Sequence, residues 1–135
     1  MKQDRLLTIA SVLSVLLLSL HLADDIVRGY EKGNLWNLTA IPIMVLWLCG
    51  ALVLAGRRSG YVINLLFSLL AVGVPIIHFS GVKGVAGGRI AGTSGAMFFV
   101  WTLLAIGATA LLGFFLSAHG LWRIAVQAGI ANPLH

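Results

Sequence analysis

Four long runs of uncharged, mostly apolar residues dominate the pattern of hydrophobic and polar positions along the chain. They cover residues 6–23, 38–56, 59–82 and about 96–118. Each run is near or above the length, roughly 18–20 residues, with which a helix crosses about 30 Å of hydrocarbon. No strand-like alternation accompanies them, which argues against a membrane β-barrel. The pattern predicts an all-α fold, an integral membrane antiparallel four-helix bundle forming a single domain over residues 1–135. We expect transmembrane helices at about residues 5–25, 38–56, 60–80 and 95–119.

Composition supports this class and excludes another. The chain is 59% hydrophobic and 10% charged, with a mean hydropathy of +1.00, whereas a soluble domain carries about 25% charged residues. The net charge of +5 does not indicate a nucleic-acid partner, because the nine lysines and arginines are spread over the connections and tails. The lipid bilayer is therefore the partner that composition predicts, and nucleic acid is not expected.

The distribution of positive charge predicts an orientation. Five basic residues flank one end of the predicted helices: Lys2, Arg5, Arg57, Arg58 and Arg123. Four flank the other end: Arg28, Lys32, Lys83 and Arg89. The small excess and the short Arg57-Arg58 turn place both termini in the cytoplasm of a multi-pass protein of the cell membrane, the inner membrane in a bacterium. The first run starts like a signal peptide, but His21 stands where a cleavage site needs a small residue, so we expect a retained helix.

Small and polar residues mark where the helices pack. Ala105, Thr109, Gly113 and Ser117 recur every four residues on the last predicted helix and form a close-contact seam, with Trp101 extending it outward. The seam lies either within the bundle or between subunits. Two further residues carry local expectations. Asn64 is predicted to hydrogen-bond a neighbouring helix, and the hydroxyl of Thr39 is predicted to cap the second helix.

The chemistry-bearing residues gather near the outer ends of the first and third predicted helices. His21 lies three and four residues before Asp24 and Asp25, so the three share one side of a helix. His78 lies about 20 residues, or roughly 30 Å of helix rise, beyond the Arg58 turn. His21 and His78 therefore face each other if the two helices are neighbours. Imidazole with carboxylate suits zinc, copper, iron or nickel, and also a proton relay. A haem held by the two histidines is a narrower alternative, and the sequence does not decide which cofactor, if any, binds.

A simpler interpretation accounts for the same residues, and the sequence favours it. Asp24 and Asp25 end the helix and start a solvated loop in which they pair with Arg28, while His21 bonds a backbone carbonyl or a serine. The residues lie at the membrane border, where water is available, which weakens the functional interpretation. The glycine-rich segment 81–95 is expected to be a flexible outer loop, with a lid as the alternative. No nucleophile–base arrangement stands out, so we do not expect an enzyme.

Three functions remain open on the sequence. The first is a structural or accessory subunit that acts through helix packing, as a homo-oligomer or in a larger membrane complex. The second is a metal- or haem-binding bundle with its site at the outer ends of the first and third helices. The third is a small transporter or channel subunit working as an oligomer, with His21, Asp24 and Asp25 at its outer mouth. No motif in the chain indicates a characterised family that would choose among them.

Overall fold

The computed structural model describes residues 2–81 and 84–131, and the side chains as far as residue 129. Within these residues the chain is helical and contains no strand, which confirms the predicted all-α class. The long elements are α1 (Lys2–Val27), α2 (Ala40–Leu48), α3 (Arg58–Ser80) and α4 (Ala96–Ala131). A 3₁₀ turn, η1 (Leu35–Thr39), precedes α2, and a π-helical turn, η2 (Cys49–Val53), follows it.

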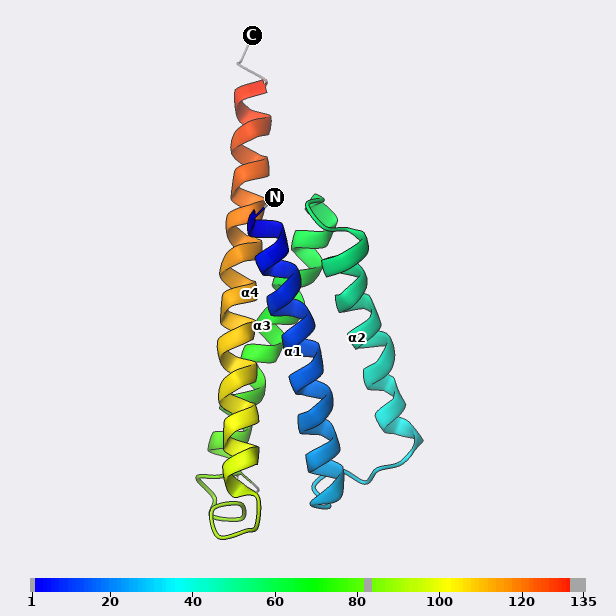
Figure 1. The fold of residues 1–135 in the computed structure, drawn as a ribbon, viewed down its shortest axis with the longest axis vertical. Coiled ribbons are helices and arrows are strands. Elements are labelled where there is room, and N and C mark those ends of the chain that lie inside the picture. The colour runs from blue at the N-terminus through cyan, green and yellow to red at the C-terminus, as the bar shows by residue number, and fades with distance from the viewer. Residues whose placement is uncertain (1, 82–83, 132–135) are drawn as a thin grey trace.

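The elements form one bundle with two distinct ends (Figure 1). The N-terminus of α1, the turn between η2 and α3, and the C-terminal half of α4 lie at one end. The loops that follow α1 and α3 lie at the other end. α4 packs along α3 and α1, whereas α2 stands to the side and contacts the bundle more sparsely, with η2 as its main contact to α3. The region between α2 and the rest of the bundle is sparsely packed and contains a cavity.

Four helical segments are long and apolar enough to cross a membrane: Lys2–Val27, Leu35–Val53, Arg58–Ser80 and Ala96–Gly129. Large apolar side chains are exposed along all of them, including Leu16, Val45, Leu70 and Phe115. α4 extends well beyond its expected end at residue 119. Its 36 residues correspond to about 54 Å of rise. The expected end followed hydropathy, but the alanines beyond it favour helix even where the sequence becomes more polar.

The predicted cap at Thr39 is wrong. The Thr39 hydroxyl instead donates to the carbonyl of Trp36 at 2.7 Å, because the backbone at Thr39 is already helical (φ −62°, ψ −22°). A hydroxyl within a helical turn reaches back to a carbonyl rather than forward to an amide. The capping role belongs to Asn34, whose side chain accepts from the Trp36 amide at 3.0 Å and starts η1.

Asn64 joins three helices in the middle of the bundle, which confirms the predicted interhelical bond. Its side-chain oxygen accepts from Ser11 of α1 at 2.7 Å and from the indole N–H of Trp47 in α2 at 3.1 Å. Its amide nitrogen donates to the Gly60 carbonyl at 2.7 Å. The side chain is fully buried, so its bonds replace the water that a polar group otherwise needs.

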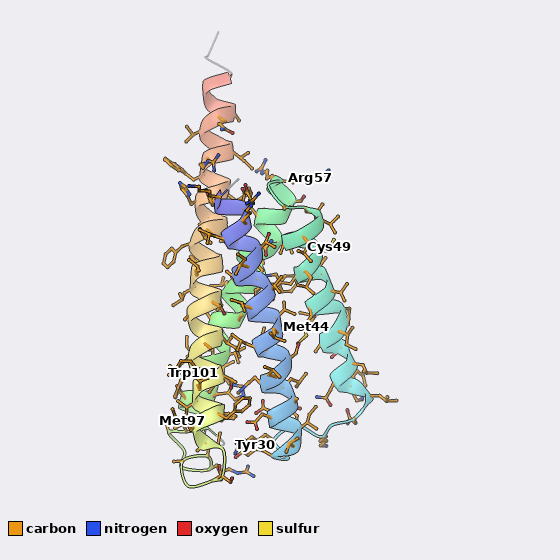
Figure 2. The ribbon with its side chains drawn as sticks, in the orientation of Figure 1. Tyr30, Met44, Cys49, Arg57, Met97 and Trp101 are labelled. Atoms are coloured by element: carbon orange, nitrogen blue, oxygen red, sulfur yellow. The ribbon has the colours of Figure 1, made fainter. Side chains whose placement is uncertain are left out.

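The small-residue seam of α4 faces the interior of the bundle. Ser117 is fully buried, and a Cβ added at Gly113 would lie 2.7 Å from the Ser68 hydroxyl of α3. The hydroxyls of Thr109 and Ser14 are 2.9 Å apart, and Ala105 is half-buried. Trp101 does not extend this stripe, because its side chain is 61% exposed (Figure 2).

Candidate metal centre

The last turns of α1 carry the first two residues of the site. His21 and Asp25 lie one helical turn apart, and both are buried, with 3% and 6% of their surface exposed. α1 ends immediately afterwards at Val27, and Gly29, two residues beyond, adopts φ +72°, a conformation that glycine tolerates best. The carbonyl of Asp25 accepts the amide of Tyr30 at 2.9 Å. The chain thus turns away sharply and leaves the Asp25 carboxylate inside the bundle.

His78, in the last turn of α3, completes the cluster. Its ring packs edge-on against the His21 ring, with centroids 4.8 Å apart and an interplanar angle of 77°. The Nε2 atom of His78 lies 3.3 Å from Asp25 Oδ2, and the Nε2 atom of His21 lies 3.7 Å from the same oxygen. One ligand atom from each residue falls within 4.8 Å of the other two. α1 and α3 are therefore close enough at this end for the two histidines to meet.

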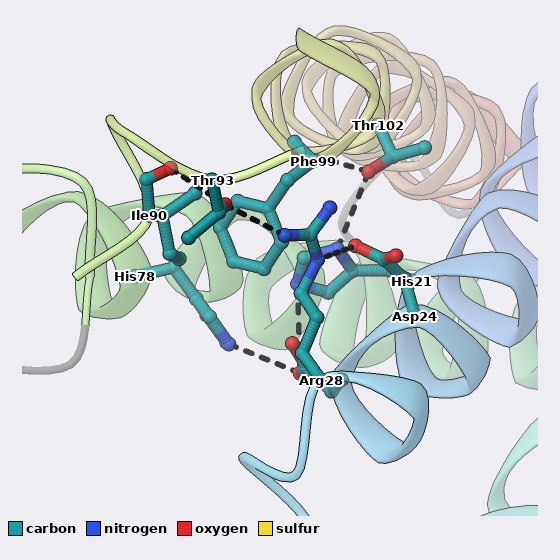
Figure 3. A network of polar contacts seen from close by, with 9 residues as sticks. His21, Asp24, Arg28, His78, Ile90, Thr93, Phe99 and Thr102 are labelled. Carbon is teal, nitrogen blue, oxygen red and sulfur yellow. Dashed lines mark hydrogen bonds and ion pairs between the residues drawn. The ribbon is translucent and has the colours of Figure 1, made fainter. Parts of the chain in front are cut away.

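Asp24, the fourth residue of the predicted site, lies outside this cluster. Its carboxylate accepts from Arg28 Nε at 2.7 Å, one turn along α1. Arg28 also donates to the Thr93 hydroxyl at 2.9 Å, across to the loop that follows α3 (Figure 3). The predicted pairing with Arg28 thus involves Asp24, while Asp25 faces inward to the histidines instead of the solvated loop. Because Arg28 neutralises Asp24, Asp25 supplies the negative charge of the cluster.

Hydrogen bonds at the far side of each imidazole determine how the rings face Asp25. The Nδ1 atom of His78 lies 2.9 Å from the Val74 carbonyl, which can only accept, so Nδ1 carries the proton. The Nδ1 atom of His21 lies 3.3 Å from the Thr102 hydroxyl. That hydroxyl donates its own proton to the Phe99 carbonyl at 2.9 Å, so it accepts from His21. In the neutral rings, both Nε2 lone pairs therefore point toward the carboxylate.

Three electron-pair donors facing one another are repulsive unless a cation lies between them. Among the described residues, His21 Nε2 and Asp25 Oδ1 are buried and have no hydrogen-bond partner. Buried polar atoms normally find one, and each unpaired atom costs about 1–3 kcal/mol. A proton or a metal ion would relieve this cost. In known metal sites, the imidazole nitrogen that does not bind the metal usually donates a hydrogen bond to a protein acceptor, as Nδ1 does in both rings here.

The distances are compatible with a proton or with a metal ion. Two ligand atoms that each lie about 2.0–2.1 Å from a tetrahedral zinc ion are about 3.3 Å from each other. The two contacts to Asp25 Oδ2, at 3.3 and 3.7 Å, are close to that value. The longest separation in the cluster is at most 4.8 Å, so the most distant pair of ligand atoms would have to move closer together to bind one ion. The donor set of two imidazoles and one carboxylate fits a divalent transition metal.

An apolar layer covers the cluster on the side of α4. The Phe99 ring is fully buried, and its centroid lies 4.8 Å from that of His21 and 5.8 Å from that of His78. The Arg28 guanidinium lies over the same ring, 5.6 Å from its centroid. Ile90, from the glycine-rich loop, is fully buried against Phe99 and Leu103. The described part of that loop, residues 84–95, is thus anchored on the bundle by Ile90.

Two cavities reach the cluster from different directions. One of about 270 Å³ lies between α1, α2 and α3 and ends at all three cluster residues. Its remaining lining is apolar: Leu18, Leu22, Ala40, Ile43, Met44, Trp47, Phe67, Leu70, Ala71 and Val74. The other, of about 400 Å³, opens toward the loops that follow α1 and α3 and is lined by Asp25, His78 and Glu31, among others. Figure 2 shows Met44, one of the residues that line the first cavity, on the side of α2 that faces α1.

Thr102 and Phe99 are the members of the site that the sequence did not identify. Thr102 is 1% exposed. The sequence did contain a signal that it faces inward, because this polar residue lies three residues before Ala105 of the small-residue seam. Trp101 was taken as the outward continuation of that seam in its place. Phe99 offered no signal, because an aromatic residue at the start of an apolar helix is unremarkable in a chain of this composition.

The fold and the cluster together define a class: an all-helical protein with four helices of membrane-spanning length and a buried His-Asp-His cluster at one end. Comparison with known proteins adds no narrower identity: no family model matches the chain, and neither the curated proteins nor the solved structures include a significant match.

Proposed function

We propose that the chain is an integral membrane protein, an antiparallel four-helix bundle, that binds a divalent transition-metal ion of the zinc class through His21, Asp25 and His78. The observation that carries the metal site is the convergence of two fixed Nε2 lone pairs on a buried carboxylate. The exposed apolar side chains on helices of spanning length support insertion in a bilayer. Three protein ligands leave one tetrahedral position for another molecule.

The proposed orientation follows the basic residues. The end of the bundle that holds the N-terminus also holds the Arg57 turn (Figure 2). Lys2 and Arg5 in the first turn of α1, Arg58 at the start of α3, and Arg123, which donates to Gln3, belong to the same end. This end is assigned to the cytoplasm of the cell membrane by the positive-inside rule. The metal centre then lies at the outer side, where the cavity lined by Glu31 gives a cation a route from water.

The other functions predicted from the sequence have less support. A haem ligated by both histidines requires its flat macrocycle between the two rings, but these rings are in edge contact at 4.8 Å. A hydrophilic pore requires polar groups that face water, whereas the mid-bundle polar residue Asn64 is fully buried and bonded. A subunit interface along the α4 seam is disfavoured because Gly113 already packs against Ser68 within the bundle.

The experiment is a metal titration of the chain purified in detergent micelles and stripped with a chelator. We expect one equivalent of Zn²⁺ or Co²⁺ per chain, measured by competition with a chromophoric chelator and by the visible absorption of bound Co²⁺. Asp25→Asn or His78→Gln should weaken binding by at least about 100-fold, since each removes a direct ligand where even supporting residues contribute 10–100-fold.

His119→Gln is the matched control. His119 is an exposed histidine that stacks on Trp122 at the opposite end of the bundle, so its replacement should leave affinity and stoichiometry unchanged. Circular dichroism of each variant reports whether the helices persist. Binding that is absent in the wild-type chain, or that falls equally in His119→Gln and His78→Gln, would overturn the proposed metal centre.

A further inference from the structure

The apolar cavity at the metal centre has the properties of a ligand site. Its volume of about 270 Å³ compares with roughly 150 Å³ for a buried apolar cavity that holds a benzene molecule. A molecule of two fused rings therefore matches it in size. The Trp47 and Phe67 side chains in its wall are nearly parallel, with an interplanar angle of 22° and ring centroids 5.8 Å apart. The two rings stack on each other and Trp47 is 2% exposed, so the partly buried Phe67 ring supplies most of the aromatic surface against which a flat aromatic occupant can pack.

The route into this cavity leads from the exposed apolar surface of the bundle. Two lining residues, Ile43 of α2 and Leu70 of α3, are 51% and 67% exposed. They lie on the flank where α2 is only sparsely packed against α1 and α3. On the proposed membrane placement this flank faces lipid, so the occupant is a molecule that dissolves in the bilayer.

The polar end of the cavity specifies the head of the ligand. The proposed metal has an open coordination position and needs a lone pair, which an alcohol or a carbonyl supplies. Asp25 Oδ1 is buried and has no hydrogen-bond partner among the described residues. A carboxylate oxygen needs a hydrogen-bond donor, and a carbonyl group has no proton to donate. A hydroxyl group meets both demands, because its oxygen ligates the metal while its proton bonds to Asp25.

We infer that the cavity binds a lipid-soluble aromatic alcohol, a phenol of one or two rings, whose hydroxyl oxygen occupies the open position of the metal and donates to Asp25. This inference rests on the proposed metal centre and names the ligand class that centre takes. The ring lies between α1, α2 and α3 against Trp47 and Phe67, and the hydroxyl points toward His21 and His78.

The test uses 1-naphthol as the probe and the Co²⁺-loaded chain in detergent micelles as the receptor. Titration should change the visible absorption of the bound Co²⁺ saturably at one equivalent of naphthol per chain. Naphthalene lacks the hydroxyl and 1-methoxynaphthalene lacks its proton, so both should bind at least about tenfold more weakly than naphthol. Binding of the probe to protein-free micelles is subtracted by equilibrium dialysis.

Two neighbouring residues of α2 supply the matched variants. Ala40 lines the cavity, so Ala40→Phe fills part of it and should reduce naphthol affinity at least tenfold while the Co²⁺ stoichiometry stays at one. Ile41 is 54% exposed and does not line the cavity, so Ile41→Phe adds an aromatic ring without an effect. If Ala40→Phe does not fold, Met44→Trp fills the same cavity from the next turn of α2.

The outcomes separate the two proposals. A chain that binds no Co²⁺ overturns the metal centre itself. A chain that binds one Co²⁺ whose spectrum does not respond to naphthol, or responds equally to naphthalene, overturns the phenol site and leaves the metal centre standing. Unchanged naphthol affinity in folded Ala40→Phe and Met44→Trp would also overturn it, because the ligand would then lie outside this cavity.

Discussion

Replacing Thr102 by valine tests whether the hydrogen bond behind His21 prepares the metal centre. Valine has nearly the shape of threonine but lacks the hydroxyl that lies 3.3 Å from His21 Nδ1. In Thr102→Val the imidazole can rotate or transfer its proton to Nε2, where it blocks the ligand position. Loss of such a supporting bond lowers metal affinity by about 10–100-fold, equivalent to about 1.4–2.8 kcal/mol.

The assay is the zinc competition titration, performed on matched threonine variants of α4. Thr109 makes its hydroxyl contact with Ser14, well inside the bundle and away from the metal centre, so Thr109→Val should retain wild-type affinity. Thr102→Ser keeps the hydroxyl and should bind within about threefold of wild type, a difference below the loss expected for a missing bond. A folded Thr102→Val chain with wild-type zinc affinity would refute the assignment of the His21 tautomer and its supporting role.

Three further predictions concern stability and pH. Asn64→Leu leaves the Trp47 indole N–H without its acceptor and should lower the free energy of unfolding by about 1–3 kcal/mol, measured by denaturation in mixed micelles; an unchanged midpoint would contradict its central role. Gly113→Leu overpacks the contact with Ser68 and should destabilise by about 1–3 kcal/mol without changing the oligomeric state in light scattering; altered assembly at unchanged stability would instead favour a subunit seam. Zinc affinity should fall as the pH is lowered, by up to about tenfold per pH unit for each proton displaced, because only neutral imidazoles ligate; a profile that stays flat down to the pH at which the helices unfold would exclude histidine ligands.

The sequence predicted the helices well because a single physical constraint governs them. Uncharged runs near the thickness of a bilayer form helices, since helices satisfy their backbone polar groups internally. The ends of the helices follow other causes. α4 continues to Ala131 through residues of good helix propensity that hydropathy does not distinguish from a tail. Thr39 was taken as a cap because its type suits one, although helical turns already precede it.

The candidate site could be predicted only in part, because it depends on contacts between distant segments. The one-turn spacing of His21 and Asp25 is visible in the sequence, but their burial depends on contacts with distant helices, such as those of His21 with His78 and Phe99. The approach of His78 depends on the relative placement of α1 and α3, which no local pattern encodes. The part played by Thr102 required knowing which face of α4 turns inward, and the neighbouring Trp101 obscured it.

The two cavities at the cluster have a consequence for what the protein could sense. One opens toward the loops that follow α1 and α3 and the other toward the apolar flank, so on the proposed membrane placement an ion and an alcohol would reach the same few atoms from separate phases. If each binds more tightly in the presence of the other, thermodynamic reciprocity makes the enhancement equal in both directions. Full occupancy would then require both ligands together, and under the two proposals the bundle would respond only when an ion from water and an alcohol from the bilayer are present at the same time.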